Sequence, residues 1–398
     1  MYSIRELFKI GNGPSSSHTI GPKEATLEFK RRYPDCDYID IYLYGSLALT
    51  GKGHLTDYII EKTILPIRST IHFDILTEKP HPNTIEFVGY KNNEKIAFMR
   101  VFSIGGGAIK IDGDIERIKD EIYPLNKYKD ISEYCNKNNL SLSQYIDSIE
   151  DESFNSYMDD IYNVMLDSID RGLNTTGVLP GKLEIKRKAN YLYYQNYNDE
   201  NEYERLRRYV VSYAYAVSEE NASGGLIVTA PTCGASGVLP AVLKYSIDLN
   251  KYSHKEIIDA LKVAGLIGNL VKKNGSISGA EAGCQAEVGT ACSMASAYLC
   301  YLENKKADKV SSAAEIALEH HLGLTCDPID GYVQIPCIER NAVAALRSID
   351  AAKLAGYLNN ADSKISFDLV VETMLDTGKD LLYQYRETSQ GGLAKNYK

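Results

Sequence analysis

The sequence predicts a small α+β N-terminal domain, with a mostly antiparallel sheet and helices, followed by an all-α domain. Short runs rich in Ile, Tyr, Phe and Val, separated by turn residues, are confined to the first third of the chain. After about residue 155, long apolar periodicities of helical type replace them. The length of 398 residues also exceeds what one hydrophobic core normally supports. We therefore expect domains at residues 1–125 and 156–398, joined by a linker with helical segments at 126–155.

The first domain mixes short strands with two helices. The expected strands are residues 38–49, 67–76, 83–90 and 95–104, and the expected helices are 19–33 and 57–65. Residues 91–94 (Lys-Asn-Asn-Glu) separate two of the strands and predict a hairpin loop. A sheet whose strands follow one another through short turns is mainly antiparallel.

One helix of the second domain is predicted in detail. Ser253 and Glu256 form a capping-box pattern before an apolar run that reaches Val271. Two lysines close the helix, and Gly275 is expected to supply a left-handed residue after it. The run is apolar on most faces, so we expect this helix in the centre of a bundle.

Composition excludes several classes of protein. The formal net charge is -9 and no dense basic run occurs, so nucleic acid is not an expected partner. The first ten residues are too polar for a signal peptide, and the longest apolar stretch, around residues 288–302, is too short and too interrupted to span a membrane. We expect a cytoplasmic protein and, from the prevalence of two-fold oligomers, a homodimer.

The eight cysteines contain no C-x-x-C pair, and in a reducing cytosol they are not expected to form disulfides. Cys284, Cys292 and Cys300 are spaced by eight residues, which on one helix is a rise of roughly 12 Å, too far for ligands of one small cluster. We interpret Cys292 and Cys300 as core residues.

Cys284 and two further thiols are candidates for one iron–sulfur cluster, because a cluster with an open iron needs three thiolates. Cys326 and Cys337 lie in a segment with two prolines and a glycine, which is not a continuous helix. Cys284 lies in a glycine-rich stretch that leaves space for sulfide. On the residues alone, three buried core thiols remain an equal alternative.

Two histidines lie next to glycine-rich or serine-rich turns. His18 follows three serines at the expected start of a helix, where hydroxyls and backbone N–H groups bind carboxylates. A helix cap is the alternative for these serines. His54 ends the stretch Gly-Lys-Gly-His before another helix, and an exposed loop histidine is the alternative there.

Five long motifs resemble, in order and over nearly the whole chain, the single-chain iron–sulfur L-serine dehydratases. They are GPSSSHTIGP, YGSLALTGKGHLTD, APTCGASGVLPAVL, SGAEAGCQAEVG and CDPIDGYVQIPCIERN. This chain departs from common family residues at Cys233, Asp330 and Tyr332. Its last eight residues hold no cysteine, so closure of the site by a C-terminal cysteine, as in some relatives, is not expected.

The resemblance implies an oxygen-sensitive lyase that converts L-serine to pyruvate and ammonia at a [4Fe-4S] cluster. The first domain then corresponds to the family's small N-terminal domain and the helical half to its catalytic domain. The implied cluster ligands are Cys284, Cys326 and Cys337. The implied base is His54, with His18 positioning the substrate or sharing the proton, and the implied substrate-binding residues are Ser15, Ser16, Ser17 and Thr19.

Other functions remain open from the sequence. A cluster-dependent enzyme of this type can instead act on L-cysteine, releasing sulfide, or on L-threonine. Residues 103–110 (Ser-Ile-Gly-Gly-Gly-Ala-Ile-Lys) offer a glycine loop beside a lysine, which suggests a pyridoxal-phosphate lyase. An alternative of another class is an amino-acid-binding regulatory protein whose cysteines are buried and metal-free.

Overall fold

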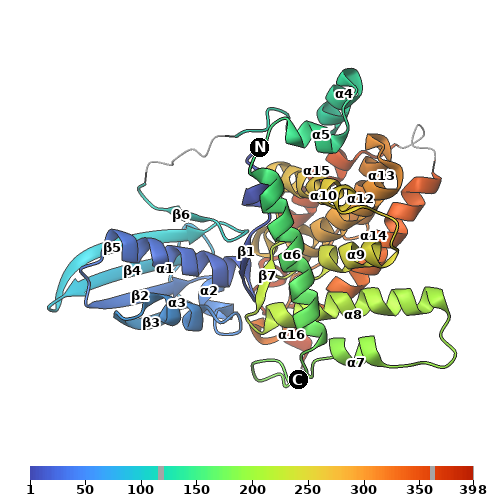
Figure 1. Cartoon of the computed structure of the whole chain (residues 1–398). Coiled ribbons are helices and arrows are strands. Elements are labelled where there is room, and N and C mark those ends of the chain that lie inside the picture. The colour runs from blue at the N-terminus through green and yellow to red at the C-terminus, as the bar shows by residue number, and fades with distance from the viewer. Residues whose placement is uncertain (115–120, 359–363, 398) are drawn as a thin grey trace.

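The computed structural model describes residues 1–114, 121–358 and 364–397. A small sheet domain lies beside a larger helical body, as Figure 1 shows, with blue and cyan elements on one side and green to red helices on the other. This arrangement confirms the predicted order of an α+β domain and a mostly helical one. No helix in the described part of the chain is long and apolar enough to cross a membrane.

The main sheet has five strands in the order β3-β2-β4-β5-β6. Only β2 and β3 pair in parallel, and the other neighbours are antiparallel, as predicted. Asn92 and Asn93 both have positive φ and form the predicted hairpin turn between β4 and β5. The strands are β2 (Tyr38–Tyr44), β3 (Arg68–Asp74), β4 (Thr84–Lys91), β5 (Glu94–Ser103) and β6 (Ile109–Ile111).

Helices α1 (Gly21–Arg32) and α3 (Thr56–Ile64) cover one face of this sheet (Figure 1). Alternate strand residues such as Ile39, Ile41 and Phe87 form one buried cluster with apolar residues of both helices. The cluster gives the small domain its own core.

The first predicted strand is too long at its end, because residues 46–50 form the short helix α2 (Ser46–Thr50). Gly45 has φ 57° and ψ -127°, a conformation that an L side chain rarely adopts. A Cβ at Gly45 would lie 2.3 Å from the carbonyl oxygen of Pro82. The chain therefore leaves the sheet at this glycine and turns into the corner that carries His54.

Substitution of this glycine tests how firmly the corner is held. We expect Gly45→Ala to destabilise the protein by more than about 2 kcal/mol, from backbone strain and the Pro82 contact together. Gly113→Ala is the matched control, because Gly113 also has positive φ but has open space around it. Urea unfolding of the full chain measures both variants, and equal losses would contradict the role of the Pro82 contact.

The second domain is a bundle of helices. The helices after the sheet are α4 (Tyr128–Asn138), α5 (Leu142–Asp147), α6 (Phe154–Leu173), α7 (Ala189–Tyr194), α8 (Glu202–Ala222), α9 (Val238–Asp248), α10 (His254–Asn274), α11 (Gly279–Ala282), α12 (Thr290–Asn304), α13 (Ala307–Glu319), α14 (Cys337–Tyr357), α15 (Phe367–Asp380) and α16 (Gly392–Asn396). Helix α10 has the predicted capping box of Ser253 and Glu256 and is buried along most of its length. Gly275, expected in the left-handed region, instead has φ -129° and ψ -131°.

The N-terminal residues and the expected linker both pack against the helical body. The short strand β1 (Ile10–Asn12) pairs antiparallel with β7 (Leu226–Val228), the one named strand within the described helical half. Met1, Ile4 and Phe8 join the core of the helical body, as do Tyr128 and Tyr145 from the expected linker. The residue boundaries of the two domains stay a prediction.

Candidate active site

The two histidines singled out in the sequence lie together. His18 lies in the π-helical turn η2 (Ser16–Ile20), and His54 lies between α2 and α3. Their imidazole rings stack with centroids 4.4 Å apart. Both side chains are buried, with exposed fractions of 0% and 1%. His54 is therefore not an exposed loop histidine.

Threonine hydroxyls bind the two histidine segments to each other. Thr19 Oγ1 donates a hydrogen bond to the backbone oxygen of His54 at 2.8 Å. Thr56 Oγ1 donates to the backbone oxygen of His18 at 2.6 Å. These reciprocal bonds fix the stacked rings, because each histidine backbone is held by the neighbouring segment.

The hydrogen-bond network assigns the tautomers of both rings. Nδ1 of His54 lies 3.0 Å from the backbone oxygen of Thr50, which only accepts, so Nδ1 carries the proton and Nε2 a lone pair. Nε2 of His18 lies 3.0 Å from the Ser46 hydroxyl. That hydroxyl donates its own hydrogen bond to the backbone oxygen of Glu387. Nε2 of His18 therefore donates, and Nδ1 has the lone pair.

Glu387 completes this group and was not predicted from the sequence. Its Oε1 lies 3.8 Å from Nδ1 of His18 and 3.8 Å from Nε2 of His54, the two atoms with lone pairs. The carboxyl group is buried, which raises its pKa well above the ordinary value, and the negative charge of Glu287 raises it further. Burial lowers the pKa of His18, and lowers that of His54 to about 4. Both rings are therefore neutral near pH 7.

Residues 383–393, here called the return segment, carry Glu387 back to the small domain. Glu387 has φ 57°, an uncommon conformation for a residue other than glycine. Its backbone N–H donates to the Cys326 oxygen at 2.8 Å, and Cys326 N–H donates to the Tyr385 oxygen at 2.8 Å. Farther along, Leu393 N–H donates to Asp327 Oδ2 at 2.7 Å. The return segment thus binds the loop of a predicted cluster ligand.

The three predicted cluster cysteines come from three separate places. Cys284 precedes the turn η3 (Gln285–Gly289), Cys326 lies in an irregular loop, and Cys337 is the first residue of α14. The first two segments are joined by a hydrogen bond from Gln285 N–H to the Leu324 oxygen at 3.2 Å. Cys284 and Cys326 are buried and Cys337 is half-buried. Cys292 and Cys300 lie within α12, fully buried, as expected for core residues.

The three thiols act on one another electrostatically. Burial raises the pKa of Cys326 well above its ordinary value; the carboxylates of Glu287 and Glu387 raise it further, and Cys284 and Cys337 contribute after them. Burial also raises the pKa of Cys337, with Cys284 the next cause. For Cys284 burial raises the pKa to about 11, against the opposing positive charge of Arg340.

These surroundings fit an iron–sulfur cluster. The donor set is three thiols, the ligands that such clusters take. Arg340 is placed to offset negative charge, because its side chain binds the Thr325 oxygen at 2.6 Å and Asp327 at 3.1 Å beside the Cys326 loop. A Cβ at Gly279 would lie 3.1 Å from Cys326 Sγ and 2.6 Å from Glu287 Oε2, so only glycine leaves space there.

The serine run lies beside His18 and is buried. Ser15 Oγ accepts from His18 N–H at 3.1 Å, and Ser15 N–H donates to Thr19 Oγ1 at 3.2 Å. Ser16 and Ser17 are also buried. The hydroxyls of Ser15 and Thr19 therefore shape the turn that carries His18, and a contact of these four residues with substrate stays a prediction.

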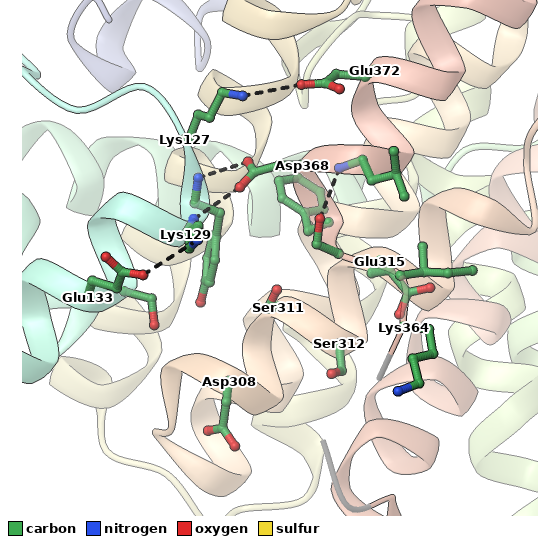
Figure 2. A pocket seen from close by; sticks show the side chains of 16 residues that line it. Lys127, Lys129, Glu133, Asp308, Ser311, Ser312, Glu315, Lys364, Asp368 and Glu372 are labelled. Atoms are coloured by element: carbon green, nitrogen blue, oxygen red, sulfur yellow. Dashed lines mark hydrogen bonds and ion pairs between the residues drawn. The ribbon is translucent and has the colours of Figure 1, made fainter. Parts of the chain in front are cut away.

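The pocket drawn in Figure 2 is a different feature. It has a volume of about 550 Å³ and lies between α4, α13 and α15. Lysines such as Lys127 and Lys364 alternate in it with carboxylates, and no cysteine or histidine lines it. Asp368 accepts from the backbone N–H groups of Tyr128 and Lys129, so it caps the start of α4 (Figure 2). None of the candidate catalytic residues lines this pocket.

Comparison with known proteins covers nearly the whole chain. The model of the serine dehydratase alpha chain matches residues 92–394, and that of the serine dehydratase beta chain matches residues 3–66. The L-serine dehydratase of Haemophilus influenzae is 39% identical over 99% of both chains. L-serine dehydratase TdcG of Escherichia coli is 40% identical over 99% of both chains. An L-serine dehydratase of Helicobacter pylori is 39% identical over 100% of this chain and 99% of its own.

Proposed function

The chain belongs to the serine dehydratase family, and from this membership we propose that it is a lyase that converts L-serine to pyruvate and ammonia. The observation that carries the proposal is the meeting of two parts of the molecule. Two neutral imidazoles of the small domain lie 3.8 Å from the carboxyl group of Glu387. The same glutamate is bonded to the loop of Cys326 in the helical domain. Ligand sites at domain junctions are common.

The cofactor in this proposal is a [4Fe-4S] cluster held by Cys284, Cys326 and Cys337. When bound, a cluster with one iron free of protein ligands supplies a Lewis acid that makes the substrate hydroxyl a better leaving group. Arg340 offsets part of the negative charge of its ligands. Because burial favours the protonated thiols, uptake of the cluster requires them to release protons.

The protein's own residues carry the proton chemistry. His54 takes the α-proton of serine through Nε2, while Nδ1 remains bonded to the Thr50 oxygen. His18 and its serine turn position the substrate. The α-proton passes to the base, the C–O bond breaks, and hydroxide departs as water after gaining a proton. The aminoacrylate formed then tautomerises and hydrolyses to pyruvate and ammonia.

The buried base sets the expected pH dependence. The pKa of His54 is lowered to about 4, so the neutral base persists above about pH 5 and is lost as the pH falls through 4. We expect kcat/KM to stay level from pH 8 to about pH 5, instead of declining near the ordinary histidine value of 6.5. Iron content measured at each pH separates loss of the cluster from protonation. A decline centred near pH 6.5 with full iron would contradict this assignment.

Anaerobic purification tests the proposal as a whole. We expect about four irons and four sulfides per chain, an absorbance lost in air, and pyruvate formed from L-serine faster than from L-threonine or L-cysteine. Sulfide release from L-cysteine as the main activity would identify a desulfidase. A borohydride-trapped lysine would support pyridoxal phosphate, although Lys110 is exposed on β6. Tight serine binding without iron would identify a regulatory protein.

Three further features belong to the proposal. The small domain comprises residues 1–125, the linker 126–155 and the catalytic domain 156–398. The enzyme is cytoplasmic, where thiols stay reduced, and is inactivated by oxygen. It forms a homodimer, which light scattering of the anaerobic enzyme tests against the 44.2 kDa mass of one chain.

A further inference from the structure

Two imidazole nitrogens and one carboxyl oxygen face one another in the candidate site. They are Nδ1 of His18, Nε2 of His54 and Oε1 of Glu387, the first two with lone pairs assigned by their partners on the other side of each ring. In the described part of the chain, no lysine or arginine forms an ion pair with Glu387. Burial raises the pKa of this carboxyl group, so without a ligand it keeps a proton, and the Ser15 hydroxyl lies 3.5 Å from Nδ1 of His18. A cationic donor from outside the protein can replace that proton and be accepted by all three groups.

The spacing of these three atoms is close to what two kinds of cation require. The carboxylate oxygen lies 3.8 Å from each imidazole nitrogen, and ligand atoms of the three residues all lie within 4.8 Å of one another. Acceptors about 2.8 Å from a tetrahedral ammonium nitrogen lie about 4.6 Å apart. Nitrogen and oxygen ligands about 2.1 Å from a tetrahedral Zn²⁺ lie about 3.4 Å apart. The observed 3.8 Å distances lie between these two values, so spacing alone does not choose between them. The choice of an ammonium group comes from charge and from the proposed function: a buried carboxyl group without a basic partner among the described residues suits a cation, and the amino-acid substrate carries one.

We propose that Glu387, with Nδ1 of His18, binds the ammonium group of the amino-acid substrate. This inference rests on the proposed function and extends it to the group that distinguishes an amino acid from other small carboxylic acids. An ammonium held by Glu387 and His18 leaves the lone pair of His54 facing the neighbouring α-carbon, from which the proton is taken. Glu387 is also bonded through its backbone to Cys326 at 2.8 Å, so the anchored amino group has a fixed position relative to the cysteine site.

The test compares two ligands that differ only in the amino group, L-alanine and propanoate. Calorimetric titration of the anaerobic holoenzyme measures their binding without turnover. We expect Glu387→Gln to weaken L-alanine binding by about tenfold to a hundredfold, the loss expected for a charged hydrogen bond, and to leave propanoate binding unchanged. The KM for L-serine is expected to rise by a similar factor, with a smaller change in kcat.

Controls separate recognition from folding. Glu372→Gln makes the same chemical change on an exposed residue of α15 and should keep both affinities. Iron content shows that the Glu387→Gln site is intact, and Glu387→Asp should retain part of the preference for L-alanine. Equal weakening of both ligands, or no weakening, would overturn the assignment, as would Zn²⁺ bound at this site that L-alanine does not displace. Wild-type protein that binds neither L-alanine nor L-serine would instead refute the proposed function.

Discussion

Replacement of Cys326 by serine is expected to remove the iron and all measurable turnover of L-serine. A serine hydroxyl is a far poorer ligand for iron–sulfur clusters than a thiolate, and three thiolates are the minimum set that the proposed site offers. The loss should reach the detection limit, at least 10³-fold in kcat. Iron and sulfide analysis, visible absorbance and pyruvate formation under anaerobic conditions measure it together.

A matched change distinguishes ligation from packing. Cys292 is fully buried in α12, where its Sγ donates to the Ala344 oxygen at 3.3 Å, an interaction that a serine hydroxyl can replace. We expect Cys292→Ser to keep its iron and its activity. Full iron in Cys326→Ser, or equal loss of iron in both variants, would argue that the thiols around Cys326 are core residues.

Replacement of His54 by glutamine is expected to lower kcat by about 10²- to 10⁴-fold while the iron content stays at the wild-type level. Glutamine keeps a polar group in the buried space but supplies no base of suitable pKa. Steady-state kinetics with L-serine and with α-deuterated L-serine measure the effect. The isotope effect should increase in the variant, because proton removal becomes the slow step.

The control for this substitution is His320→Gln, on a histidine whose side chain is 52% exposed. That change should leave kcat within twofold of wild type. His18→Gln should have an intermediate effect on kcat and a larger one on KM if His18 holds the substrate. A His54→Gln enzyme with wild-type kcat would exclude His54 as the base.

Local patterns predicted most of the fold because local interactions determine those elements. Two asparagines that tolerate positive φ predicted the β4–β5 hairpin, and the capping box predicted the start of α10. The errors occur where a distant contact decides. Gly45 turns the chain against Pro82, and the expected left-handed Gly275 packs against Met374 of α15, 3.0 Å from the position a Cβ would take. Neither contact is visible in a local window.

The candidate site was predictable to the extent that its residues are rare. The chain has 7 histidines and 8 cysteines, few enough for each one near a glycine-rich turn to be considered as a catalytic or ligand residue. The family resemblance then selected among them. Glu387 is one of 53 acidic residues and lies in no pattern that marks it. Its position beside the two imidazoles follows from the return segment pairing with the Cys326 loop, an interaction that only the folded structure reveals.

The return segment is near the end of the chain, so the candidate site is completed last when a new molecule is synthesised. During synthesis the small domain and most helices leave the ribosome before Glu387, and domains tend to fold as they emerge. Both imidazoles and all three thiols are therefore present while the carboxylate that joins them has not yet been translated. A transcript cut short before residue 387 would yield protein with every predicted catalytic side chain and no completed binding site.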